Sequence, residues 1–267
     1  MIDYHIHTSL CGHASGTLSQ YLVLAREKGL QEIGFADHFP LGLLGYAPRN
    51  KVTMEPEELA GYMAEVRQLN GRFPEVTVRL GVEVDFLPGK SSIIAKQLAG
   101  YSFDYVIGSV HFIEGWDFTH PDRAGEYEDK DLRELYDRYF NLVWEACRSG
   151  LFDIIGHVDV IKKFGYALPE PEMEAYWVET ARVLKQTGTC LELNTAGRDA
   201  PVKQFYPGYR GLEICFQEGV PITLGSDAHA PQQVGRYFTE ALELLRRAGY
   251  QKLTGFSRRR QLFIDLG

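Results

Sequence analysis

Histidines recur along this sequence at the points where short apolar runs end. His5 and His7 stand one residue apart at the end of the first run, and side chains on a strand alternate with a period of two. Both imidazoles would therefore lie on one face. The histidines that follow predicted strands in this way are His5, His7, His38, His111, His157 and His229, and His13 lies in the first loop. Only His120, in a long polar loop, falls outside the pattern.

Carboxylates also lie at the ends of the predicted strands. Those at predicted strand ends are Asp37, Glu83, Asp85, Asp159 and Asp227. A single histidine or carboxylate at a strand end is more often structural than catalytic, so it is their joint placement that predicts a site. Neutral imidazole nitrogen and carboxylate oxygen form the ligand set preferred by zinc, iron and manganese. Such ions would compensate the buried carboxylates, and they favour hydrolysis over redox chemistry.

The elements that would position these residues alternate between short β-branched runs and longer amphipathic runs. This order is typical of βα units around a parallel sheet. The predicted strands cover residues 2–6, 32–36, 76–84, 105–110, 152–156, 190–193 and 221–224. The predicted helices cover 18–28, 55–69, 91–98, a segment around 135–146, 172–186, a short helix that ends at Glu218, and 233–248, followed by a tail.

Seven strands with helices between them predict a closed or nearly closed α/β barrel of the TIM-barrel type, with an open doubly wound sheet as the alternative. In a barrel, catalytic residues come from the carboxyl ends of several strands at one face. In an open sheet they gather mainly where the strand order reverses. No composition break divides the chain, so residues 1–267 are expected to form a single domain.

The composition limits the classes of partner. The net charge of −8 at pH 7 and the pI of about 5.5 disfavour nucleic acid, because the protein would repel its phosphates. The 4 cysteines are widely spaced, which suits a reducing compartment. The N-terminus resembles no export signal and no run is apolar enough to span a membrane, so we expect a cytoplasmic protein. A homo-oligomer is left open.

Seven motifs, in order along almost the whole chain, resemble the polymerase and histidinol phosphatase (PHP) superfamily. They are HIHTSLCGH at 5–13, ADH at 36–38, GVEVDFLPG at 81–89, GSVHFI at 108–113, GHVDVIKKFG at 156–165, ELNTAGR at 192–198 and GSDAH at 225–229. GSVHFI, KKFG and ELNTAGR are similar to the monofunctional histidinol-phosphate phosphatases of histidine biosynthesis. The resemblance implies a distorted (β/α)7 barrel.

The resemblance also implies a site for three metal ions, of zinc, iron or manganese. The first ion would be held by His5, His7, Glu83 and Asp227, the second by Glu83, His111 and His157, and the third by His13, His38 and His229. A hydroxide that bridges the first two ions would attack the phosphorus of L-histidinol phosphate. Glu83 and Asp227 are therefore expected to be catalytic. Asp37, Asp85 and Asp159 are candidates to orient the imidazoles or, equally, to cap turns.

The substrate contacts are predicted from charge and loop position. Arg198 directly follows the sixth strand, and its guanidinium matches two phosphate oxygens, so it is the first choice for a catalytic phosphate clamp. A surface pairing with Asp199 is the alternative. Lys162 and Arg49 are weaker candidates. Trp116 and Asp117, in the long loop at 112–130, are expected to contact the imidazole and ammonium of the substrate.

Two other functions are compatible with the same motifs. One is a different phosphoesterase of this superfamily, a nucleotide phosphatase or a 3′-exonuclease, although the acidic pI disfavours polynucleotides. The other is a non-catalytic domain that keeps its metals for structure. Structural sites usually close their coordination shells, which disfavours this second alternative.

Overall fold

Seven parallel strands form the centre of the protein. The computed structural model describes residues 1–48 and 50–266, and its main sheet has the order β1-β2-β3-β4-β7-β8-β9. The strands are β1 Ile2–Ile6, β2 Glu32–Phe35, β3 Thr77–Asp85, β4 Tyr105–Ser109, β7 Ile154–Ile155, β8 Cys190–Asn194 and β9 Ile222–Gly225. All seven lie within the predicted runs or one residue beyond them, but β7 keeps only two residues of 152–156.

The first and last strands of this sheet meet just beyond β9. The amide of His7 donates to the Ala228 carbonyl at 2.9 Å, and the amide of Ala228 donates to the His5 carbonyl at 3.1 Å. These bonds form a parallel bridge between Ile6 and Ala228. The sheet is therefore a nearly closed barrel, as predicted, and the open-sheet alternative is wrong.

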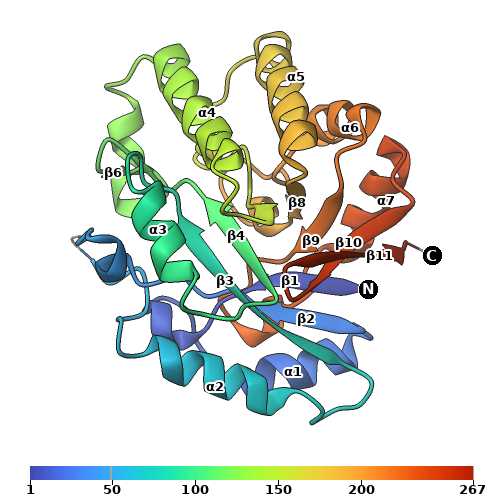
Figure 1. The fold of residues 1–267 in the computed structure, drawn as a ribbon. Helices are drawn as coiled ribbons and strands as arrows, with labels where there is room; N and C mark the ends of the chain where they lie inside the picture. Colours follow the sequence, from blue (N-terminus) through green and yellow to red (C-terminus); the bar gives the residue numbers. More distant parts are fainter. Residues whose placement is uncertain (49, 267) are drawn as a thin grey trace.

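The described part of the chain contains seven α-helices. They surround the strands (Figure 1). They are α1 Leu18–Glu27, α2 Leu59–Leu69, α3 Ser91–Leu98, α4 Leu132–Arg148, α5 Glu170–Thr187, α6 Tyr209–Glu218 and α7 Phe238–Ala248. Two begin later than predicted. Before α2, the Glu58 carboxylate accepts the Glu55 amide at 2.7 Å and stabilises a turn. Before α7, Tyr237 has a positive φ of 57°, which interrupts the helix.

Two hairpins were not predicted. The expected tail forms β10 Lys252–Ser257 and β11 Arg260–Asp265, joined by Arg258 and Arg259 with φ of 51° and 64°. Asn-Gly is the usual signal of such a turn, so the arginines concealed it. Within the long loop, β5 Phe112–Ile113 pairs with β6 Trp116–Asp117. This second hairpin lies beside the end of β4, which matters for the site.

Among residues 1–48 and 50–266, the helices are too short or too polar to cross a lipid bilayer.

Candidate metal centre

Glu83 lies at the centre of a cluster of imidazoles at the carboxyl end of the barrel. Its carboxylate is 1% exposed, and its two oxygens lie 3.0 Å from His38 Nδ1 and 3.0 Å from His157 Nε2. His5 Nε2 lies 3.4 Å from Glu83 Oε2, and His111 Nε2 lies 3.7 Å from Oε1. Ends of four different strands thus place their side chains around one buried carboxylate.

The remaining predicted ligands lie beside this group. His7 Nε2 is 3.1 Å from Asp227 Oδ1. The rings of His7 and His229 stack with centroids 4.1 Å apart, and those of His13 and His229 are 4.7 Å apart. The structure therefore brings all nine predicted metal ligands together at one face of the barrel.

Two of these residues adopt backbone conformations that favour glycine. His157 has φ of 24° and Asp227 has φ of 51°, and each lies two residues after the end of its strand, β7 and β9 respectively. Such strain costs about 1–3 kcal/mol and persists only where the surroundings enforce it. Here it turns both side chains toward the cluster, as expected for a functional site.

The donor atoms fit divalent cations. His5 Nε2 and Glu83 Oε2 are buried, face each other at 3.4 Å and have no hydrogen-bond partner among the described residues. A cation between them would satisfy both atoms, which are otherwise costly to bury. The groups whose donor atoms lie within 4.8 Å of one another include His5–His7–Glu83, His38–Glu83–His111 and His7–His38–His229. Nitrogen and carboxylate oxygen donors suit zinc, iron or manganese.

A cavity of about 530 Å³ opens onto this cluster. The long loop contributes Phe112, Asp117, Thr119 and His120 to its lining. A lysine that the sequence reasoning did not choose, Lys163, also lines it, and its ammonium group donates to the Thr119 carbonyl at 2.9 Å. Burial lowers the pKa of Lys163. The arrangement combines a cation-binding cluster with a fixed ammonium group, and so suits an anionic ester.

The sequence profile of the PHP domain matches residues 3–196, and that of the PHP-associated segment matches residues 210–246. The chain belongs to the PHP family. A probable histidinol-phosphatase of Deinococcus radiodurans is 41% identical, over 98% of both chains. The histidinol-phosphatase of Bacillus subtilis is 27% identical, over 90% of this chain and 98% of the relative.

A solved structure shares the PHP fold of this chain. The histidinol phosphate phosphatase of Lactococcus lactis, complexed with zinc, L-histidinol and phosphate, superposes with a TM-score of 0.82. It is 23% identical, and the match covers 98% of each chain.

Buried carboxylates orient the imidazoles of this PHP centre. Asp85 Oδ1 lies 2.8 Å from His111 Nδ1, and Asp37 Oδ1 lies 3.4 Å from His7 Nδ1. Glu192, which the sequence reasoning missed, lies 2.6 Å from His5 Nδ1. The sequence signal that could have identified Glu192 is its place in the middle of an otherwise apolar strand, where a carboxylate needs a partner. Asp159, by contrast, pairs with Lys162 at 2.7 Å, and within residues 1–48 and 50–266 it forms no hydrogen bond or ion pair with an imidazole.

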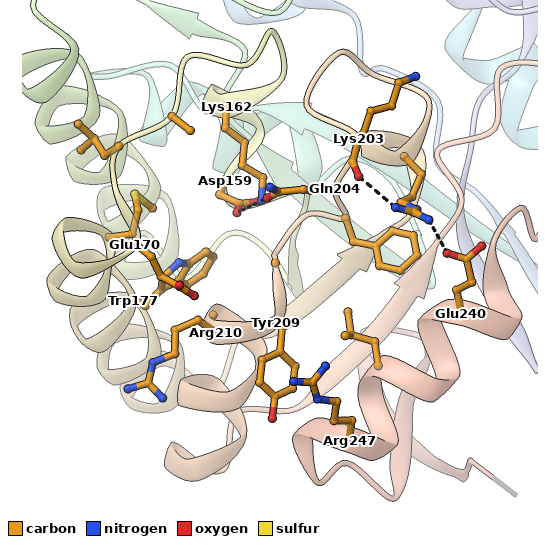
Figure 2. A pocket seen from close by; sticks show the side chains of 18 of the residues that line it. Asp159, Lys162, Glu170, Trp177, Lys203, Gln204, Tyr209, Arg210, Glu240 and Arg247 are labelled. Carbon is orange, nitrogen blue, oxygen red and sulfur yellow. Dashed lines mark hydrogen bonds and ion pairs between the residues drawn. The ribbon is translucent and has the colours of Figure 1, made fainter.

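Arg198 and Lys162 line a second cavity, of about 770 Å³, rather than the one at the PHP centre (Figure 2). The Arg198 guanidinium bonds to Glu240 at 2.8 Å and to the Lys203 carbonyl at 3.1 Å. The structure therefore does not bring the expected phosphate clamp to the imidazoles. Asp199 pairs instead with Arg236, at 2.8 Å, so the alternative pairing with Arg198 is not formed either.

The other predicted substrate contacts divide between the cavity and its surroundings. Asp117 lines the cavity at the PHP centre, whereas Trp116 is buried beside it and is contacted by Lys130, 4.6 Å from its ring. His120, expected to be a loop residue or a substrate contact, also lines the cavity. Arg49 lies outside the described residues.

The carboxylates and imidazoles of the centre shift one another's pKa values. Burial alone would raise the pKa of Glu83, but His38, His5 and His111 hold it well below its usual range. Burial opposes protonation of His7 and His111, yet nearby carboxylates, chiefly Asp227 for His7 and Asp85 for His111, raise both pKa values to about 9. Without metal, the protein thus retains protons that an ion would displace.

We expect the metal-free protein to lose stability above neutral pH. The pKa of about 9 for His7 and His111 lies above the unfolded value of 6.5, so their contribution is full below pH 6.5 and disappears as the pH rises through 9. Burial, with the charges of His38 and His7, lowers the pKa of His13 to about 4, so its contribution falls as the pH drops from 6.5 to 4. Thermal unfolding with chelator at several pH values measures this. A melting temperature that rises from pH 7 to pH 9 would contradict the assignment.

Proposed function

We propose that this protein hydrolyses L-histidinol phosphate to L-histidinol and phosphate, a step of histidine biosynthesis, with three divalent metal ions. The observation that carries the proposal is the convergence of nine predicted metal-ligand side chains on one centre, seven of which line a cavity that Lys163 also lines. The 41% identity to a probable histidinol-phosphatase over 98% of both chains supports the choice of substrate.

The proposed ligands divide among three ions. His5, His7, Glu83 and Asp227 would hold the first, Glu83, His111 and His157 the second, and His13, His38 and His229 the third. The grouping of His5, His7 and Glu83 donor atoms within 4.8 Å supports the first set. When bound, divalent ions supply positive charge to phosphoryl oxygens and make water nucleophilic near neutral pH. Zinc, iron and manganese all accept this ligand set.

The chain's own side chains orient the substrate and the ligands. Lys163, fixed by the Thr119 carbonyl, supplies the phosphate contact that had been expected from Arg198. Asp37, Asp85 and Glu192 each hold a proton on the Nδ1 of an imidazole, which leaves Nε2 with its lone pair toward the centre. The resulting centre is rigid before substrate arrives, as electrostatic catalysis requires.

The test is a panel of phosphomonoesters offered to the purified protein, with its metals counted by elemental analysis. Turnover of histidinol phosphate well above that of nucleotides, with close to three ions per chain, is the expected result. Faster release of phosphate from nucleotides, or cleavage of 3′ termini of DNA, would replace the proposal with another phosphoesterase activity. A fully loaded protein that cleaves no ester would indicate a non-catalytic metal protein.

A further inference from the structure

Only one oxygen of the Asp117 carboxylate, Oδ1, is held by hydrogen bonds within the described residues. Asp117 ends β6, in the hairpin that forms part of the cavity wall. Its Oδ1 accepts three hydrogen bonds, from the Thr119 amide at 3.1 Å, the Thr119 hydroxyl at 2.9 Å and the His120 amide at 3.1 Å. These donors fix the orientation of the carboxylate.

The second oxygen of Asp117 is uncommitted. Within residues 1–48 and 50–266, Oδ2 accepts no hydrogen bond, and Asp117 has no ion pair within 4.0 Å. The nearby cation Lys163 donates to the carbonyl of Thr119 instead. Lys163 and Arg123 interact electrostatically with the Asp117 charge at longer range, but neither donates to Oδ2. This oxygen therefore stays open to a donor on a ligand in the cavity that Asp117 lines.

The hairpin fixes the position of this carboxylate relative to the imidazoles. The amide of Phe118, the residue after Asp117, donates to the carbonyl of His111 at 3.3 Å. Apolar side chains, among them Val52, Phe112 and Val160, also line the cavity. The cavity therefore offers two charge preferences: an anion site at the imidazoles and an acceptor oxygen at Asp117, with the Lys163 ammonium in electrostatic interaction with both Asp227 and Asp117.

We propose that Asp117 selects phosphomonoesters that carry a cationic group, an ammonium or an imidazolium, a few bonds from the phosphate. The inference rests on the proposed function, because it places the phosphate at the metal centre. It explains how the cavity would discriminate against nucleotides, whose sugar and base bring no cation to this position. The interaction is a charge-assisted hydrogen bond from the substrate to Asp117 Oδ2.

The substitution Asp117→Asn tests the role of the free oxygen, Oδ2. Asparagine can keep the oxygen that accepts the Thr119 and His120 donors and replaces only the other oxygen by an amide. Three substrates are compared: histidinol phosphate, 2-aminopropyl phosphate, which has the ammonium but no imidazole, and 4-nitrophenyl phosphate, which has neither. We expect kcat/KM for histidinol phosphate to fall about 10- to 30-fold, chiefly through KM, while that for 4-nitrophenyl phosphate stays within about 2-fold.

The aminopropyl ester identifies the cation. If its kcat/KM falls with that of histidinol phosphate, the ammonium is recognised; if only histidinol phosphate is affected, the imidazole is. Asp129→Asn, which removes an exposed charge from the same loop, is the control and should change nothing. Equal losses on all three substrates, or none, would overturn the selectivity role. A wild-type protein inert toward all three would instead refute the proposed function, and this inference with it.

Discussion

Replacement of Glu83 by glutamine is expected to lower kcat/KM for the phosphomonoester by about 1000-fold or more, the rate equivalent of about 4 kcal/mol. Glu83 is the carboxylate that the most imidazoles share: His38 and His157 at 3.0 Å, with His5 at 3.4 Å. Glutamine has almost the same shape but no charge. In the proposed centre, two ions would then lose their common anionic ligand, so metal content should fall together with activity.

The control is Glu65→Gln, the same chemical change at an exposed carboxylate on α2. Because Ser109 Oγ also donates to Glu83, at 2.6 Å, circular dichroism and thermal unfolding must show that the Glu83 variant is folded. A folded Glu83→Gln protein that keeps its metals and its full activity would show that Glu83 is not a metal ligand.

Much of the site could be predicted because strand ends impose geometry. The carboxyl ends of parallel strands meet at one face, so His5, Glu83, His111 and Asp227 had to converge once the strands were recognised. β1, β2, β3, β4, β7 and β9 each end at, or one or two residues before, a histidine or a carboxylate, which marks the strand end in the sequence. The convergence of the polar residues therefore follows from short-range patterns, whereas the choice of a closed barrel over an open sheet rested on the family resemblance.

The substrate contacts could not be predicted in this way, because loops do not share that geometry. The 3-10 turn η4, Val160–Lys162, directs Lys162 toward Asp159 and Gln204, while the next residue, Lys163, lines the catalytic cavity. No rule based on residue spacing predicts which of two adjacent lysines in a turn faces the cavity. Arg198 was misplaced for a similar reason: Glu240, on α7, holds it away through a contact between distant parts of the chain.

Glu192 is the residue whose replacement tests the orientation of the ligands most sharply. Its carboxylate is 1% exposed and joins two ligand-bearing strand ends: Oε1 lies 2.6 Å from His5 Nδ1, and Oε2 accepts the His157 amide at 2.8 Å. Gly225 leaves room for it, since a Cβ there would lie 2.0 Å from Oε1. A carboxylate has no donor, so His5 must carry its proton on Nδ1 and keep Nε2 free for an ion.

Glu192→Gln is expected to weaken binding of one ion about 100-fold and to lower kcat/KM by a similar or larger factor. If the amide oxygen accepts the His157 amide, the side-chain NH2 group faces His5 Nδ1 and drives the proton to Nε2, where it blocks the metal. If the amide is reversed, two donors meet at His157. Glutamine therefore cannot satisfy both contacts, although it fits the space.

Metal titration monitored by calorimetry measures the affinity, and ¹⁵N chemical shifts of His5 report which nitrogen carries the proton. Glu65→Gln again serves as the control. A purely structural role for Glu192 would lower the melting temperature but leave the His5 tautomer and the affinity of the folded protein unchanged. Loss of affinity together with a proton on Nε2 would instead show that a carboxylate behind the centre determines which imidazole nitrogen faces the metal.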